Sequence, residues 1–347
     1  MIKKIGIRVL ILLVLLTGLN MVYNAFFYDA VIRDKYPEKL RLNKTQDSAS
    51  VFYFGESSNV TYLPDDSLTS YISGFTNLFF PSLKIQPITK YASHGGIYKQ
   101  WIKEFDPGKP KPKAIVVTLN LRSFGANWIH SKLETQLQEP LVLTKPYPNL
   151  VNRFLLSLQA FDNKTVKERE EEMLLEWKSK KLLFPKPFKY KTVREWDDAM
   201  AAGGYLKPDG SWDQEKIELA CHFIKNFAFN IDSTNPRVKD FDEISRWCAN
   251  NNINLYLNLM AENVHYADSL VGKDLVFLMK QNRDYLVKRY NRNNCRVIDN
   301  LECVDGKEFI DVKWTTEHYR YRGRMLIARN LAHSLRNQFK KEYIEAY

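Results

Sequence analysis

Apolar segments of strand length alternate with amphipathic segments of helical length along most of this chain. The clearest strand is AIVVTLN, residues 114–120, which stays apolar until its polar end, as a strand buried on both faces should. Four more strands are expected, at residues 50–55, 83–89, 253–260 and 295–299. Strands that alternate with helices predict a mostly parallel sheet covered by helices on both faces. The expected fold class is α/β, with a mostly parallel five-stranded sheet in three α/β/α layers.

Helical spacing of apolar residues appears between these strands and after the last of them. Helices are expected at residues 65–80, 96–105, 237–251, 271–291 and 322–342. Asp65 or Asp66 would serve as the N-cap of the first one, because a short acidic side chain there accepts from free backbone N–H groups.

The alternation breaks at about residues 126–232. A crossover between parallel strands needs only a dozen or so residues, so this segment is too long for one connection. It contains a charged helix at residues 166–181, a stretch of proline, lysine and aromatic residues, and a glycine-rich turn. We therefore expect a largely helical insertion here, and not another part of the sheet.

The first 28 residues are typical of a membrane anchor. Lys3 and Lys4 precede an apolar run close to the roughly 20 residues needed to cross a bilayer, and no small-residue cleavage site follows. The pattern favours an uncleaved signal anchor, with a cleaved signal peptide as the alternative. Either places the remaining chain outside the cytoplasm, as a juxtamembrane connector at residues 29–49 and one main domain at residues 50–347. The expected location is a single-pass membrane protein with a periplasmic or cell-surface domain.

Charge and cysteine content restrict the partners. The net charge of +11 suits an anionic membrane surface or cell-wall polymer, or simply a solvated basic surface. Nucleic acid is not expected as a partner, because the chain shows no recognisable reader motif. The four cysteines lack paired zinc spacing and are too few for a disulfide scaffold. Cys295 and Cys303 could form a bridge, or the thiols stay free and buried.

Polar clusters follow three of the expected strands. Residues 55–59 read GESSN, residues 93–96 read SHGG, and Asn120 and Arg122 follow the third strand. Ligands of open parallel sheets bind at the carboxyl ends of the strands, near the point where the strand order reverses. We expect all three clusters to face one crevice there.

These clusters contain the groups that acyl transfer needs. A serine nucleophile requires a base within hydrogen-bond reach and donors aimed at the developing oxyanion. Ser57 is the candidate nucleophile, with Ser58 as the alternative hydroxyl, and a plain turn serine is the competing interpretation. His318, just before the last helix, is the candidate base. The Asn120 amide and an N–H of the glycine loop are the candidate oxyanion donors.

The order of these blocks resembles the GDSL, or SGNH, hydrolase superfamily. GES at residues 55–57 resembles its G-D-S block, HGG its glycine loop, TLN its asparagine block and HYRYRGRMLIARNLA its histidine block. The resemblance covers residues 50–335 apart from the insertion. It implies a flavodoxin-like SGNH fold in which Ser57 is the nucleophile, His318 the base, and Asn120 with Gly95 the oxyanion donors.

Two positions depart from the family pattern. Thr315 stands where the family usually has an aspartate, three residues before its histidine. Orientation of the imidazole would then fall to Glu317, Asp311, Asp299 or a backbone carbonyl. The glycine loop is imperfect as well, so its donor could be the N–H of Ser93, Gly95 or Gly96.

The layout of an anchored SGNH-like domain is similar to that of the teichoic-acid D-alanyl-transfer proteins and of polysaccharide O-acetylation partners. Those families work beside a multi-span membrane-bound O-acyltransferase. The resemblance implies a serine-dependent acyltransferase or esterase that acts on acyl groups of a cell-surface glycopolymer and needs no cofactor or metal. The alternatives are a catalytically inactive SGNH-like binding or scaffold subunit of such a system, and a tethered esterase for soluble substrates. The acyl group, the acceptor, hydrolysis versus transfer, and the oligomeric state are open at this point.

Overall fold

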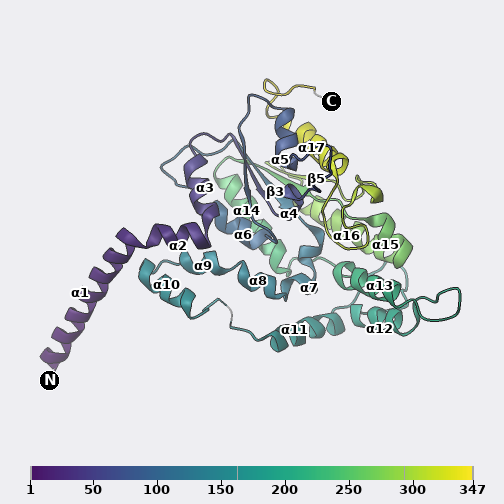
Figure 1. The fold of residues 1–347 in the computed structure, drawn as a ribbon, viewed down its shortest axis with the longest axis horizontal. Coiled ribbons are helices and arrows are strands. Elements are labelled where there is room, and N and C mark those ends of the chain that lie inside the picture. Colours follow the sequence, from purple (N-terminus) through teal and green to yellow (C-terminus); the bar gives the residue numbers. More distant parts are fainter. Residues whose placement is uncertain (1, 162, 293, 346–347) are drawn as a thin grey trace.

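Most of the first helix projects away from the rest of the chain, and its C-terminal end meets the domain (Figure 1). The computed structural model describes residues 2–161, 163–292 and 294–345. Helix α1 (Ile2–Phe26) projects from the domain and is long and apolar enough to cross a membrane (Figure 1). An apolar helix is therefore present within the expected segment, residues 1–28.

A five-stranded, wholly parallel sheet forms the centre of the domain, which confirms the expected α/β class. The strands are β1 (Val51–Gly55), β2 (Ile85–Thr89), β3 (Ala114–Leu119), β4 (Asn254–Leu259) and β5 (Cys295–Asp299). Their spatial order is β2-β1-β3-β4-β5, so the chain winds one way from β1 and the other way from β3. The switch point of the sheet therefore lies between the carboxyl ends of β1 and β3.

Helices cover both faces of this sheet. Successive strand residues point to opposite faces, so Val51 and Tyr53 pack into one apolar cluster while Phe52 and Phe54 pack into another. The first cluster includes α5 (Ile72–Leu78) and α17 (Tyr321–Leu335). The second includes α6 (Gly95–Lys103), α14 (Pro236–Asn250) and α16 (Lys273–Tyr290). The domain therefore has three layers.

Helix α5 begins later than expected. The spacing of apolar residues predicts a start beside Asp65 or Asp66, but α5 begins at Ile72. The Asp66 carboxylate accepts from Arg324 of α17 at 2.9 Å instead of capping α5. A tertiary ion pair thus replaces the local cap that the sequence suggested.

The segment at residues 29–49 is helical and belongs to the packed domain. It forms α2 (Tyr28–Lys35) and α3 (Pro37–Thr45). Ile32, Tyr36 and Leu42 are buried in the larger apolar cluster. The chain that follows α1 is therefore packed onto the domain.

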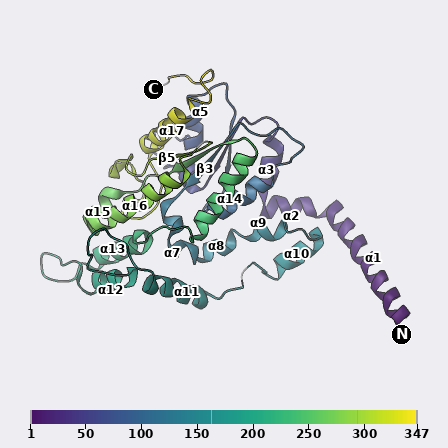
Figure 2. The same ribbon diagram turned by 180° about the vertical axis from the view of Figure 1, so that it is seen from behind.

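The chain between β3 and α14 is largely helical, as expected. Its elements are η1 (Leu121–Phe124), α7 (Ala126–Ile129), α8 (Lys132–Gln136), α9 (Glu139–Leu143), α10 (Asn149–Ser157), α11 (Val166–Ser179), α12 (Val193–Gly203) and α13 (Gln214–Phe227). Figures 1 and 2 show α7 to α10 as a row running back toward α1, with α12 and α13 at the other end of the domain. Phe223, Ile224 and Phe227 of α13 are buried in the main core, so the insertion extends that core.

The four cysteines are free thiols. Cys303 is partly buried and the other three are buried. The sequence-based option of a bridge between Cys295 and Cys303 is not what the structure shows.

Candidate active site

Ser57 stands at the carboxyl end of β1, at the first position of the short helix α4 (Ser57–Val60). Its side chain is partly exposed, whereas Ser58 is completely buried. Ser57 Oγ lies 3.1 Å from His318 Nε2, although the two residues are 261 positions apart in the chain. The structure thus brings the candidate nucleophile and the candidate base within hydrogen-bond distance.

Asp311 lies behind the His318 ring. His318 Nδ1 is 2.9 Å from Asp311 Oδ2, and the Thr316 hydroxyl donates to the same oxygen at 2.7 Å. Partial burial by itself raises the pKa of Asp311, but the hydrogen bonds from Thr316 and His318 outweigh it and lower this pKa. A carboxylate that holds the proton on Nδ1 leaves Nε2 free to accept one from Ser57.

A local hairpin explains how an aspartate seven residues before the histidine reaches it. Phe309 and Tyr319 form an antiparallel bridge, and Ile310 N donates to His318 O at 2.9 Å. Trp314 N donates to Asp311 O at 2.9 Å and closes a turn between the two arms. The ends of this loop therefore lie side by side. Asp311 can contact His318 from seven residues earlier in the chain, although the family's aspartate stands three residues earlier.

The other candidate acids are engaged elsewhere. Glu317 accepts two hydrogen bonds from Arg122, each 2.8 Å long. Asp299 Oδ2 accepts from Arg283 at 2.6 Å. Thr315, at the usual position of the family's aspartate, places its hydroxyl 2.9 Å from His222 Nε2.

Arg324 holds the histidine loop against the β1 side of the site. Its completely buried guanidinium donates to Tyr319 O, the residue after His318, and to Asp66 Oδ2 at 2.9 Å. It also donates to Leu68 O and Ser70 O, which belong to the loop after α4. Arg324 is therefore a positioning residue for the loop that carries His318.

Glu56 is a close neighbour of Ser57 to which the sequence assigned no role. Ser57 Oγ donates to Glu56 Oε2 at 2.6 Å, and Ser58 N donates to Glu56 Oε1 at 3.0 Å. The carboxylate caps α4 and also competes with His318 for the serine proton. The position of this acidic residue directly before Ser57, in GES, could have indicated the contact.

The oxyanion candidates Asn120 and Gly95 follow the strands on either side of β1. Asn120 is buried, and its Oδ1 has no hydrogen-bond partner among the described residues. In the glycine loop, Ser93 N donates to Lys90 O, and Gly96 N donates to His94 Nδ1 at 3.1 Å. Gly95 opens α6, so its N–H has no acceptor within the helix. Among the three candidates, Gly95 thus has the N–H with no acceptor in the described structure.

A buried cluster of charge lies next to the site. Glu262, just after β4, is fully buried with no partner for Oε1 among the described residues. Burial, with the nearby Glu317 carboxylate, raises the pKa of Glu262 well above its usual value. Arg122 balances the charge of Glu317. Glu262 could have been found by the rule that selected the first three polar clusters, because it also follows a buried strand.

His222 is the residue that the insertion adds to this region. It lies on α13, and its ring packs edge-on against the exposed Trp314 at a centroid distance of 4.8 Å. Burial, together with Arg122 and Lys225, lowers the pKa of His222 to about 4. Its ring is therefore neutral at physiological pH. The sequence offered no signal for this contact, since it depends on how α13 packs.

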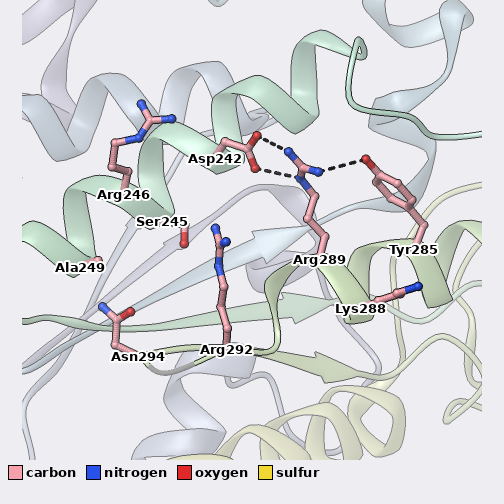
Figure 3. A pocket seen from close by; sticks show the side chains of 9 residues that line it. All are labelled: Asp242, Ser245, Arg246, Ala249, Tyr285, Lys288, Arg289, Arg292 and Asn294. Carbon is pink, nitrogen blue, oxygen red and sulfur yellow. Dashed lines mark hydrogen bonds and ion pairs between the residues drawn. The ribbon is translucent and has the colours of Figure 1, made fainter.

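Two large cavities are among those that lie outside the serine site. One of about 500 Å³ is lined by His222, Trp314, Lys313 and residues of α12 and α13. The larger, of about 750 Å³, is lined by α14, α16 and the chain before β5. It is basic: Figure 3 shows Arg289 bonded to Asp242 and Tyr285, with Arg246 and Arg292 nearby. Neither cavity is lined by Ser57 or His318, so cavity size does not locate the candidate chemistry.

Within the described part of the chain, no group of three or more His, Cys, Asp or Glu side chains is placed to hold a metal ion. No protein-family model matches the chain, and no curated protein sequence does either. The function is therefore argued from the site itself.

Proposed function

We propose that the protein is a serine-dependent acyltransferase or esterase. The observation that carries this proposal is the chain of contacts from Ser57 through His318 to Asp311, with distances of 3.1 and 2.9 Å. A hydroxyl, an imidazole and a carboxylate in this order are the parts of a nucleophile–base–acid triad.

The proposed reaction has two acyl-transfer steps. His318 Nε2 takes the Ser57 proton while Oγ attacks an acyl carbonyl, and the N–H groups of Gly95 and Ser57 with the Asn120 amide bind the oxyanion. His318 then gives the proton to the departing alkoxide, which leaves an acyl-serine. In the second step, His318 deprotonates water or a sugar hydroxyl, which takes the acyl group and restores Ser57.

The finer assignment of the fold, a flavodoxin-like SGNH domain, is part of this proposal. Its support is the strand order with a switch point between β1 and β3, and the position of the serine, glycine and asparagine blocks after β1, β2 and β3.

The proposed substrate is an acylated glycopolymer of the cell surface. The support is the layout: an apolar N-terminal helix long enough to anchor the chain, followed by one domain with the serine site. With α1 in the membrane and the domain outside the cytoplasm, a multi-span membrane-bound O-acyltransferase is the proposed partner. The proposed chemistry uses only protein groups and requires no cofactor.

A second function is favoured by the Glu56 contact. In the observed geometry the Ser57 hydroxyl donates to a carboxylate at 2.6 Å, which is shorter than its distance to His318. A hydroxyl that donates to Glu56 does not at the same time donate to His318, the proposed base. That arrangement suits a catalytically inactive SGNH-like subunit that binds polymer or supports the membrane acyltransferase.

Serine labelling and turnover separate these functions. The full chain in detergent micelles would be treated with a fluorophosphonate probe and assayed with p-nitrophenyl acetate. We expect the wild type to be labelled and active, and Ser57→Ala to lose the label and to lower kcat by up to about 10⁶-fold. Ser58→Ala is the matched control and should keep both the label and the turnover, because Ser58 is completely buried.

Equal labelling of the wild type and Ser57→Ala would contradict the nucleophile assignment. A folded wild type with neither label nor turnover would favour the second function.

A further inference from the structure

Helix α10 carries an apolar stripe that no part of the domain covers. Val151, Phe154 and Leu158 follow each other at intervals of three and four residues, so they lie on one side of the helix. Phe154 and Leu158 are each 61% exposed. Tyr147, just before the helix, is 52% exposed. Large apolar side chains gathered in this way mark an interaction surface.

The opposite side of α10 is bound to the protein, so the stripe cannot rotate inward. The buried Asn152 side chain donates to Lys145 O at 2.9 Å and to Leu143 O at 3.2 Å. Leu156 is buried in the main core. These contacts hold α10 against α9 with its apolar stripe outward.

Helix α10 also touches the apolar helix α1 near its end. Leu150 N donates to Asn20 Oδ1, and Asn149 Nδ2 donates to Asn24 Oδ1, each at 3.0 Å. Both views of the ribbon show α10 beside the part of α1 that meets the domain (Figures 1 and 2). The level of α10 along the membrane normal is therefore set by the level of Asn20 and Asn24.

Several aromatic residues lie at the same level as Asn20 and Asn24, at the end of α1 and just after it. Tyr23, Phe26, Phe27 and Tyr28 follow the most apolar part of α1, and Tyr and Trp side chains prefer the membrane–water interface. Tyr23 is buried by the domain, while Phe26 and Phe27 are exposed. With α1 in a bilayer, these residues and α10 lie together at its outer surface.

We propose that α10 is a second, interfacial attachment to the membrane, with Tyr147, Val151, Phe154 and Leu158 inserted among the lipids. Amphipathic helices bind at this depth when their apolar side enters the boundary between headgroups and acyl chains. Lys145 is exposed at the start of this segment, where it can reach anionic headgroups. The inference rests on α1 remaining in the membrane and is independent of the proposed catalysis.

Two attachment points fix an orientation that one anchor would leave free. α7 and α8, which follow the carboxyl end of β3, belong to the same row as α10 (Figure 1). With α10 in the interface, this row lies along the membrane, and the domain is prevented from turning about the end of α1.

Site-directed fluorescence tests the lipid contact. The full chain with Phe154→Cys would be labelled with an environment-sensitive fluorophore and placed in phosphatidylcholine–phosphatidylglycerol vesicles. We expect quenching by doxyl-labelled lipids and protection from aqueous iodide. Leu206→Cys is the matched control, since Leu206 is similarly exposed in the loop between α12 and α13. Its label should show the reverse pattern. Unmodified protein, treated in parallel, corrects for labelling of the native cysteines.

Two results would overturn the proposal. Iodide quenching at position 154 equal to that at position 206 would place α10 in water. Protection from both quenchers would show that protein, such as a second copy of the chain, covers the stripe. Labelling at Val151→Cys repeats the test one turn away and guards against a local effect of replacing Phe154.

Discussion

The serine site and the large basic cavity both contain arginine–carboxylate pairs, but their surroundings differ. Near the serine site, the Arg324 and Asp66 side chains are 0% and 2% exposed. In the cavity of Figure 3, the Arg289 and Asp242 side chains are 30% and 22% exposed. The first pair connects segments far apart in the chain, whereas the second joins two packed helices at the surface.

The two regions therefore differ in how deeply their charged groups are buried. Buried polar groups are costly unless each has a partner, so a buried network of charged groups needs a reason beyond packing. Perturbed and mutually bonded groups are also typical of functional sites. The basic cavity has a volume of about 750 Å³, yet most of the cationic side chains that line it are exposed to solvent. Connectivity of buried groups is therefore the better guide to function in this protein.

The largest expected effect is on the proposed triad. Asp311→Asn should lower kcat for p-nitrophenyl acetate by about 10³- to 10⁴-fold, because the ring loses the carboxylate that fixes its tautomer. Asp299→Asn is the matched control: this aspartate was also a candidate from the sequence, but it contacts Arg283. Steady-state kinetics of both variants measure the effect. Equal losses in the two variants would mean that Asp311 has no special role.

Stability should separate the two arginine pairs. Arg324→Leu leaves Asp66 buried without its partner and should cost about 3–5 kcal/mol of unfolding free energy. Arg289→Leu removes a partly exposed pair and should cost about 1 kcal/mol or less. Denaturant unfolding of the full chain in micelles gives both values. Similar losses would remove the contrast between the two regions.

A smaller effect is expected in the pH dependence of stability. The pKa of His222 is lowered from 6.5 to about 4, so between these values a proton binds the unfolded chain but not the folded one. Stability should therefore fall as the pH decreases from about 6.5 to about 4, and this loss should be smaller in His222→Gln.

Melting temperatures of the wild type and the variant at pH 7 and pH 5 measure this change. His265→Gln, at an exposed position, is the control and should keep the wild-type difference between the two pH values. A His222→Gln variant with the full wild-type difference would show that another group titrates in this range.

Much of the fold could be predicted because its signals are local. The five strands lie within a few residues of their expected positions, and the helical character of the insertion was readable from composition. The start of α5 could not be predicted in this way, because Asp66 pairs with Arg324 and does not cap α5. The candidate pair Ser57 and His318 could be named because each stands in a recognisable motif beside a strand or helix end. Glu56 was placed in the GESSN cluster without a role, and Glu262 was missed, although each follows a strand.

The sequence by itself determined the elements, their α/β class, the apolar N-terminal helix and the candidate nucleophile and base. Those features depend on residue type and on periods of two and 3.6 residues, which are set within short windows. Only the tertiary structure decided the strand order, the placement of Asp311 instead of Glu317 behind His318, and the contact of His222 with Thr315. Each of these joins groups whose meeting depends on how loops close and helices pack, and no local pattern records that.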